Sequence, residues 1–424
     1  MAVDTTDDRA RGHAGARLIP LRKNRDFLLL QSGQVLSTIG TESTAIAYPL
    51  LVLTVTHSPA KAGVVGFARI VPWALFGFLA GAAADRLPRK RVMVTADVVR
   101  SLLLATVVVA IAAGHISFLQ IALVAFLEGS MFVFFNVAEF GALRSVVAAS
   151  QLPTAAAAEQ ARYSTVTLVA PPTGGALFGL GRAFPFLAGA LSPAFSLVTL
   201  LAIRTPFQED RDHDEASLRS QLAEGFRFLW ARPFLRSCAL LFTWSNLVFE
   251  GLFLIMIVVA RRQGLSSSAI GALIAAFGAC MLLGSVISPR FQKLLSMRSI
   301  VILSLWLQTG IVGFVADPSI YILLACAAPM AIFFPTVNAV VIGYRIAVTP
   351  DRLTGRVNSV ARTIALCGAP LGPLTAGVML GAFSARTTVA VFGGLLVVLA
   401  SLASLLPSIR QAPSLAELTP EAAA

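Results

Sequence analysis

Three glutamates stand inside long apolar runs, where a carboxylate can do chemistry. They are Glu42, Glu128 and Glu250. Placing a charge at the centre of a bilayer costs about 2.5–3.5 kcal/mol even on the mildest scale, so ionisable residues in such runs are functional candidates by default. Because burial disfavours the charged form of a carboxyl group, such a glutamate can take up a proton on one side and release it on the other. The sequence therefore predicts proton handling at one or more of these positions.

Arg69 is the most obvious partner for one of these acids. At about 1.5 Å per residue, Glu42 lies ~22 Å into its run and Arg69 lies ~12 Å from the opposite face. In an apolar core about 30 Å thick, the two residues are at similar depths. Glu42 either neutralises Arg69 or carries a proton, and both roles stay open. Glu128 has the least obvious partner, so Glu128 and Glu250 are the first choices for proton coupling and Glu42 is the third.

Aromatic residues surround these acids. Phe132 and Phe135 follow Glu128 in the same run, and Phe249 precedes Glu250. With Arg69, they are our candidates for the substrate cavity, although phenylalanines at such spacing can equally be packing residues. A cavity with few charges suits an amphipathic or cationic organic molecule better than a sugar phosphate.

Composition places these residues in a membrane protein. Of the 424 residues, 57% are hydrophobic and 13% are charged, and the mean hydropathy is +0.81. Soluble domains have roughly 45–50% apolar and about 25% charged residues, so a soluble chain is excluded. The net charge of +12 is carried by short segments between the runs, which indicates orientation in a membrane and not nucleic-acid binding. The histidines lie outside the runs and the cysteines lack metal-like spacing, so we expect no metal and no cofactor.

The apolar runs predict an all-α membrane fold of twelve spanning helices, each of about 20 residues. A charged and then amphipathic segment, 204–236, separates two six-helix halves over 27–203 and 237–409, and is typical of a surface helix at Leu218–Trp230. The segments 1–26 and 410–424 are predicted tails. The predicted spans are 27–56, 62–84, 92–113, 117–143, 154–179, 184–203, 237–260, 267–289, 299–316, 319–345, 356–381 and 386–407.

Basic residues fall on one side of this topology. The tails and the gaps on their side hold 24 Lys and Arg residues, against 5 on the other side. Because cytoplasmic loops are enriched in Lys and Arg, we expect both termini in the cytosol.

The two halves share short motifs. Three matches recur at offsets of 202 to 207 residues. The first is Arg25-Asp-Phe-Leu with Arg232-Pro-Phe-Leu, and the second is Ala170-Pro-Pro-Thr-Gly-Gly with Gly372-Pro-Leu-Thr-Ala-Gly. The third is Gly81 with Gly284. Such repeats are common in transporters that bind their substrate between two halves near the bilayer midplane.

A basic cluster joins the second and third spans. Gly81 allows close helix approach, and Asp85 can cap a helix or pair with an arginine. The run is Gly81-Ala-Ala-Ala-Asp85-Arg86-Leu-Pro-Arg89-Lys90-Arg91. It resembles the loop signature of the major facilitator superfamily. We assign these residues to a gate, together with Arg144 and with Asp97 and Arg100, which are three apart on one helix and predict a local salt bridge. Glu139, five residues before Arg144, is interpreted as structural.

A proline–glycine segment marks the fifth span. Pro171, Gly174 and Gly175 resemble the Gly-Pro-x-x-Gly-Gly signature of proton-driven antiporters in that superfamily, with Ala170 departing at the first position. Prolines kink a membrane helix and glycines let a partner pack close, so a generic kinked helix is the alternative interpretation.

Other segments resemble one branch of the superfamily, the bacterial exporters of macrolides, siderophores and other natural products. They include Gly40–Leu51, Arg69–Pro72, Ala96–Arg100 and Thr349–Ser359. The resemblance implies a secondary active exporter of a small amphipathic compound, driven by proton antiport, in the bacterial cytoplasmic membrane. We expect a monomer whose partners are a small-molecule substrate, protons and lipid. An importer or symporter on the same fold is the alternative; a membrane enzyme or a sensor would need a catalytic cluster or an output domain, for which the sequence gives no sign.

The gate assignment makes a first prediction. We expect Asp85→Asn protein to insert normally but to transport poorly, because Asp85 is the acid that can hold the basic loop against the other half in the outward-open state. Efflux by membrane vesicles, normalised to the amount of inserted protein, checks this. Efflux at the wild-type rate would remove Asp85 from the gate.

Overall fold

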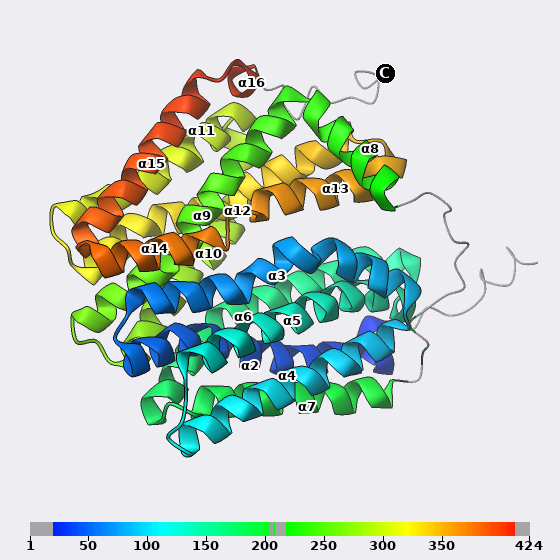
Figure 1. Ribbon diagram of the computed structural model, residues 1–424. Coiled ribbons are helices and arrows are strands. Elements are labelled where there is room, and N and C mark those ends of the chain that lie inside the picture. Colours follow the sequence, from blue (N-terminus) through cyan, green and yellow to red (C-terminus); the bar gives the residue numbers. More distant parts are fainter. Residues whose placement is uncertain (1–19, 204, 206, 208–217, 412–424) are drawn as a thin grey trace, which may run out of the picture.

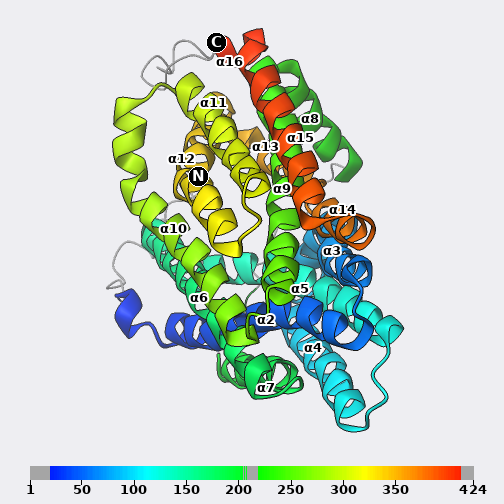
Figure 2. The same cartoon turned by 90° about the vertical axis from the view of Figure 1, so that its left-hand side faces the viewer.

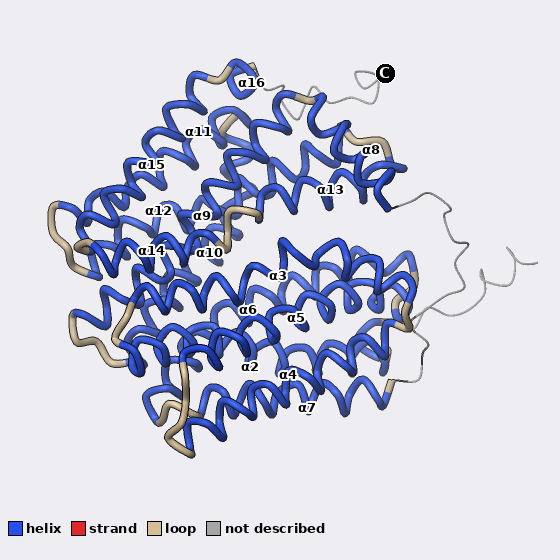
Figure 3. The backbone as a smooth tube through the Cα atoms, in the orientation of Figure 1, coloured by secondary structure: helices blue, strands red, loops and turns tan. Residues whose placement is uncertain are grey.

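The computed structural model describes residues 20–203, 205, 207 and 218–411, and every regular element in them is a helix (Figures 1 and 3). The predicted tails, apart from 20–26 and 410–411, and the charged part of the linker, 208–217, lie outside the described residues.

The N-terminal half contains α2 (Arg25–Thr56), α3 (Pro59–Arg86), α4 (Arg89–Ala112), α5 (Phe118–Val146), α6 (Leu152–Leu180) and α7 (Phe184–Ala202). After the linker helix α8 (Leu218–Ala231), the C-terminal half contains α9 (Pro233–Arg262), α10 (Ser267–Leu294), α11 (Met297–Gln308), α12 (Ile320–Val348), α13 (Asp351–Leu366), α14 (Leu371–Ala382) and α15 (Ala385–Leu405). Short helices complete the chain at η1 (Leu21–Lys23), η2 (Ala149–Gln151), η3 (Thr309–Val315) and α16 (Pro407–Arg410).

The helices have the lengths and compositions of membrane spans. Eleven stretches among the described residues are long and apolar enough to cross a bilayer. In α6 the stretch Thr165–Leu180 is a further, shorter apolar segment. The all-α fold of two six-helix halves is therefore confirmed.

Two predicted spans are less regular than expected. The ninth continues from α11 into the tighter helix η3, and the eleventh is broken into α13 and α14 at residues 367–370. Pro370 cannot donate a helix hydrogen bond. The α9 side chains Thr243 and Asn246 donate to the carbonyl groups of Ile364 and Ala365, at 2.7 and 3.1 Å. These bonds satisfy backbone groups at the break, as a helix interruption inside a bilayer requires.

The halves meet through two helix pairs with closely matching surfaces. Helix α6 packs on α10, and α3 packs on α14 (Figure 2). A Cβ atom at Gly175 would lie 2.5 Å from the Ser267 carbonyl oxygen and 2.9 Å from the Cα atom of Gly271. A Cβ atom at Gly377 would lie 2.7 Å from the Cα atom of Gly63. Glycine at these positions allows backbone-to-backbone contact between the halves.

These contacts lie at one end of the molecule. Gly63 stands near the start of α3 and Gly175 near the end of α6, so both belong to the end opposite α8. Toward α8 and the start of α13 the helices of the two halves diverge (Figure 1). The halves are therefore joined at the glycine contacts and splayed at the end that carries the linker.

The contact at Gly175 predicts a packing defect. We expect Gly175→Ala to lower the free energy of unfolding by about 1–3 kcal/mol, the usual cost of overpacking a tight contact. Thermal unfolding of the purified protein in detergent measures it.

Gly394→Ala is the matched control, because nothing lies within 4 Å of a Cβ atom at Gly394. In an open helical position alanine is neutral or stabilises by up to about 1 kcal/mol. Equal melting temperatures for the two variants would contradict the close contact.

Candidate functional site

Arg69 of α3 lies between two carboxylates from neighbouring helices. Its guanidinium is 3.8 Å from Glu42 Oε1 on α2, and its Nε is 3.9 Å from Glu128 Oε2 on α5. Both distances are long for salt bridges, and this Nε is buried with no hydrogen-bond partner among the described residues. Glu42 thus pairs with Arg69, which is one of the two roles that the sequence left open, and the arginine is held loosely from both sides.

Arg100 of α4 is held much more firmly. Its Nε lies 3.4 Å from Glu128 Oε1, its Nη1 lies 3.4 Å from Asp97 Oδ1, and its Nη2 donates to the hydroxyl of Thr41. The side chains of Arg100, Asp97 and Glu128 are all at most 1% exposed. Buried charges of this kind are stable only when paired and hydrogen-bonded. Glu42, Arg69, Glu128, Arg100 and Asp97 thus form one continuous set, here called the charge cluster.

The sequence predicted that Glu128 has the least obvious partner, but it pairs with both Arg69 and Arg100. That prediction was wrong because α3 and α4 both pack on α5, and linear spacing does not reveal this. A side chain at position 129 would collide with the carbonyl oxygen of Arg69. Gly129 consequently brings the two helices close enough for the adjacent Glu128 to face Arg69. The predicted salt bridge of Asp97 with Arg100 is present, and it lies in this cluster.

Glu250 approaches the cluster from the other half. It stands on α9, it is partly buried, and Arg69 and Glu42 are the charged groups that act on it electrostatically. Among the described residues it has no ion-pair partner within 4 Å. Phe249 beside it stacks on Phe334 at 5.1 Å. The two candidate acids Glu42 and Glu250 thus interact electrostatically with the same arginine, and each belongs to a different half.

Aromatic rings connect the cluster to the C-terminal half. Arg100 lies 5.4 Å from the ring centre of Phe132, and Phe132 meets Trp73 edge to face at 6.2 Å. Arg362 of α13 lies 5.1 Å from the ring centre of Trp73. Phe132 is thus near the cluster, as predicted, whereas Phe135 is buried in a packing core of the N-terminal half.

Tyr48, Thr41, Trp73 and Arg362 were missed by sequence reasoning. Tyr48 is fully buried beside the cluster, and its hydroxyl has no hydrogen-bond partner among the described residues. The sequence shows that Tyr48 lies inside a span, six residues after Glu42. The linear spacing did not indicate that Tyr48 lies near the two arginines.

A second ion cluster lies further along α5 and α6. Arg162 lies 2.9 Å from Glu139, contacts Glu159, and donates to Thr38 at 3.2 Å. These contacts tie α2, α5 and α6 together, which agrees with the structural interpretation of Glu139. The partner is Arg162, and the side chain of the expected neighbour Arg144 lies outside the described residues.

The basic loop is fixed to its own half. Arg89 donates to the carbonyl oxygens of Gly141 and Phe207 at 3.0 and 3.2 Å, and Lys90 donates to that of Ile203 at 2.7 Å. Cations near helix C-termini satisfy carbonyl groups that have no partner in the helix. These two residues therefore hold α5 and α7 against the start of α4.

The described part of the structure gives no contacts between the remaining predicted gate residues and the other half. The side chains of Asp85 and Arg86 lie outside the described residues, and Arg91 is exposed. The expectation that Gly81 supports close helix packing was wrong for this conformation, since no described atom lies within 4 Å of a Cβ atom there. Gly81 stands near the end of α3 that points toward the splayed end of the molecule.

The proline–glycine segment of α6 makes two different contacts. Gly174 packs against the backbone of Ser43 on α2, whose hydroxyl donates to Ala170 at 3.2 Å. Gly175 makes the contact with α10 described above. Pro171 lies inside this continuous helix. The segment therefore fixes α6 both to its own half and to the other half.

A family model described as Major Facilitator Superfamily matches residues 31–305 and 243–422. The chain belongs to this superfamily. It is accordingly a transporter, and the predicted family and fold are confirmed.

Two curated relatives match along nearly their whole lengths. The multidrug efflux pump Tap of Mycolicibacterium fortuitum is 26% identical over 406 residues, which cover 92% of this chain and 97% of that protein. Tap of Mycobacterium tuberculosis (strain ATCC 25618 / H37Rv) is 26% identical over 414 residues, covering 91% and 94%.

Solved structures share the fold. A bacterial homologue of the human lysosomal transporter Spinster, in an inward-facing and unoccupied conformation, superposes with a TM-score of 0.74 at 18% identity and covers 92% of this chain and 97% of its own. An inward-facing bacterial homologue of the iron transporter ferroportin gives 0.71 at 15% identity, covering 91% and 99%.

In this transporter the charge cluster is the arrangement with chemical capacity. It contains three carboxylates and two guanidiniums, so it carries one negative charge when all five groups are ionised. The described residues contain no group of three or more His, Cys, Asp or Glu that could hold a metal.

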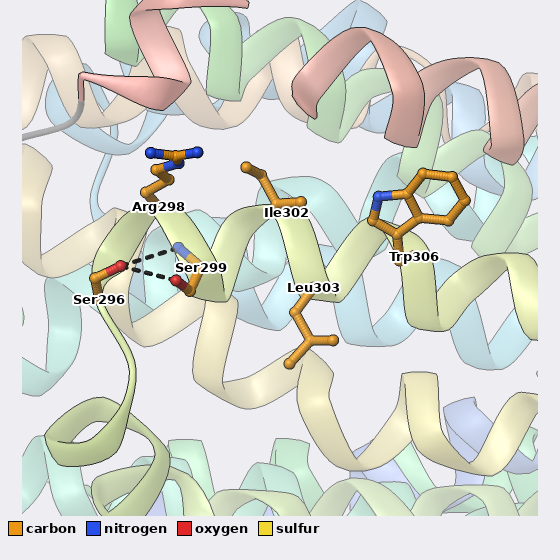
Figure 4. Close-up of a pocket in the computed structure, with 6 residues that line it drawn as sticks. All are labelled: Ser296, Arg298, Ser299, Ile302, Leu303 and Trp306. Carbon is orange, nitrogen blue, oxygen red and sulfur yellow. Dashed lines mark hydrogen bonds between the residues drawn. The ribbon is translucent and has the colours of Figure 1, made fainter. Parts of the chain in front are cut away.

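A pocket of about 550 Å³ lies elsewhere, on α11, and is lined by Ser296, Arg298, Ser299, Ile302, Leu303 and Trp306 (Figure 4). Helix α11 packs on α12 and α15 of its own half, so this pocket is separate from the space between the halves.

The firm hold on Arg100 predicts a large effect on stability. We expect Arg100→Met to lower the free energy of unfolding by about 3–5 kcal/mol, because Asp97 and Glu128 are left buried without their cation. Adding Glu128→Gln to this variant should restore part of the loss.

Thermal unfolding in detergent provides the comparison, with Arg182→Met, an exposed loop arginine, as control. Two results would each show that Arg100 does not balance these acids. One is Arg100→Met protein that melts at the same temperature as the Arg182→Met control, and the other is a double variant that is no more stable than Arg100→Met alone.

Proposed function

We propose that the protein is a drug-efflux transporter that exports small amphipathic, cationic organic compounds in exchange for protons. The observation that carries this proposal is that Glu42 and Glu250, one on each half, both interact electrostatically with Arg69. The names of the curated relatives support the efflux assignment. The aromatic side chains beside these acids, Phe249 and Phe132, suit an organic cation.

The charge balance supports exchange. The cluster has one carboxylate more than it has guanidiniums, and Glu250 adds another acid nearby. Excess negative charge away from water is unfavourable. One proton or one substrate cation relieves it, and occupation by one makes the other less favourable. Competition of this kind is what antiport requires.

The three glutamates differ in their suitability as proton carriers. Glu128 is buried between two arginines, which suits an anchor that joins helices better than a carrier. Glu42 has one long ion pair and a side chain that is 38% exposed, and Glu250 has no ion-pair partner among the described residues. We therefore assign proton coupling to Glu42 and Glu250, with Arg69 as the cation that shifts between its partners.

If both termini lie in the cytosol, the splayed end of the protein opens inward. With both termini and the linker in the cytosol, as the Lys and Arg distribution predicts, the glycine contacts close the outer end and the splayed end opens inward. A substrate would then enter between α3 and α13 from the cytosol or the inner leaflet. We propose a monomer, because each chain contains both halves of the site.

Coupling can be tested in proteoliposomes with an imposed proton gradient and ethidium as an amphipathic cationic probe. We expect Glu42→Gln and Glu250→Gln each to lower gradient-driven transport by at least tenfold while ethidium still binds or exchanges downhill. The reason is that an amide cannot release a proton when the substrate arrives.

Asp317→Asn, at an exposed loop acid, is the control and should pump normally. Gradient-driven transport that is unchanged in both glutamine variants, or that survives collapse of the gradient by an ionophore, would rule out proton antiport at these residues.

A further inference from the structure

The linker helix α8 is held at the edge of the membrane by its connection to the next helix. It ends at Ala231, and the membrane-spanning helix α9 begins at Pro233. A helix that stops one residue before a span cannot lie far from the bilayer surface. This placement holds whichever way the transporter is oriented.

One face of α8 presents two aromatic rings that are substantially exposed. Phe226 and Trp230 are one helical turn apart, and their rings stack at 5.0 Å with an interplanar angle of 17°. They are 44% and 40% exposed. The neighbouring residues Gly225 and Leu229 are buried. The stacked pair is therefore displayed outward, and two large rings in such a position are typical of side chains that rest at headgroup level.

Arginines flank these rings. Arg227 is exposed beside Phe226. Arg236 lies 5.7 Å from the ring centre of Trp230 and donates to its carbonyl oxygen at 3.5 Å, and Arg232 lies 3.8 Å from the ring centre of Phe228. The described side chains of α8, Ala223–Ala231, include one acid, Glu224, which faces Arg356 of α13 at 2.5 Å. The outward face is thus aromatic and positive, without a described carboxylate.

We propose that this face, formed by Phe226, Arg227, Trp230 and Arg236, is a binding site for anionic phospholipids. Its charge complements phosphate-bearing headgroups, and its rings match the interface between headgroups and acyl chains. The covalent link to α9 keeps it at that depth.

Lipid bound here would act on the transporter through α13. Glu224 is ion-paired with Arg356, and a Cβ atom at Gly225 would lie 2.9 Å from the Arg356 carbonyl group. At its other end, α13 meets α3 of the opposite half through Arg362 and Trp73. Anionic lipid would therefore hold the helix that forms one side of the splayed end.

Brominated lipids, which quench nearby tryptophans, test binding without any transport assay. The full chain carries four tryptophans, so Trp73→Phe, Trp244→Phe and Trp306→Phe together leave Trp230 as the single reporter. In phosphatidylcholine liposomes, brominated phosphatidylglycerol should quench Trp230 at lower mole fractions than brominated phosphatidylcholine. Arg227→Ala and Arg236→Ala should each reduce this preference by about fivefold, which corresponds to about 1 kcal/mol per basic residue.

Arg182→Ala, at an exposed arginine on the other end of the molecule, is the matched control and should leave the preference intact. Raising the salt concentration from 0.05 to 1 M should weaken the preference in protein with all its arginines present, so the test does not depend on a variant that folds poorly. Equal quenching by the two lipids, or a preference insensitive to salt and to both arginine variants, would overturn the proposal. Because only binding is measured, failure here leaves the proposed efflux function untouched.

Discussion

A carboxylate removed from water requires compensating positive charge, and the N-terminal half is built around one such group, Glu128. Its two oxygens face Arg69 and Arg100, so one side chain on α5 connects α3 with α4. Arg100 extends the connection to Asp97 and to Thr41 on α2. In a low-dielectric interior a missing partner costs several kcal/mol. The pairing therefore fixes how four helices pack around the loosely bound Arg69.

Backbone contacts at glycines and ion pairs in the charge cluster occupy different parts of the transporter. Glycines at Gly175 and Gly63 join the halves by backbone packing at one end, where close approach leaves little freedom. The charge cluster, in contrast, contains long ion pairs at Arg69 and an acid on the opposite half, Glu250. A change in protonation or in substrate occupancy alters the balance of charges there and not at the glycines. Under the proposed mechanism, this separation would let a small electrostatic change bias a large movement of the halves.

The fold was largely predictable from sequence, because apolar runs and the Lys and Arg distribution are properties of the linear chain. The same holds for the repeated segments, since Gly175 and Gly377 make equivalent contacts on opposite sides of the molecule. The pairing of Glu128 was not predictable, since it depends on packing between α3, α4 and α5. The break at residues 367–370 was missed for a similar reason: the bonds from Thr243 and Asn246 that make it tolerable come from a distant helix.

The central claim is that a proton and a cationic substrate compete for the acids around Arg69. Proton release on binding measures this directly. Ethidium added to the purified transporter in weakly buffered detergent solution should release about one proton for each molecule bound, and the release should disappear in the Glu42→Gln/Glu250→Gln double variant. Ethidium binding with no proton release by the wild-type protein would contradict the account.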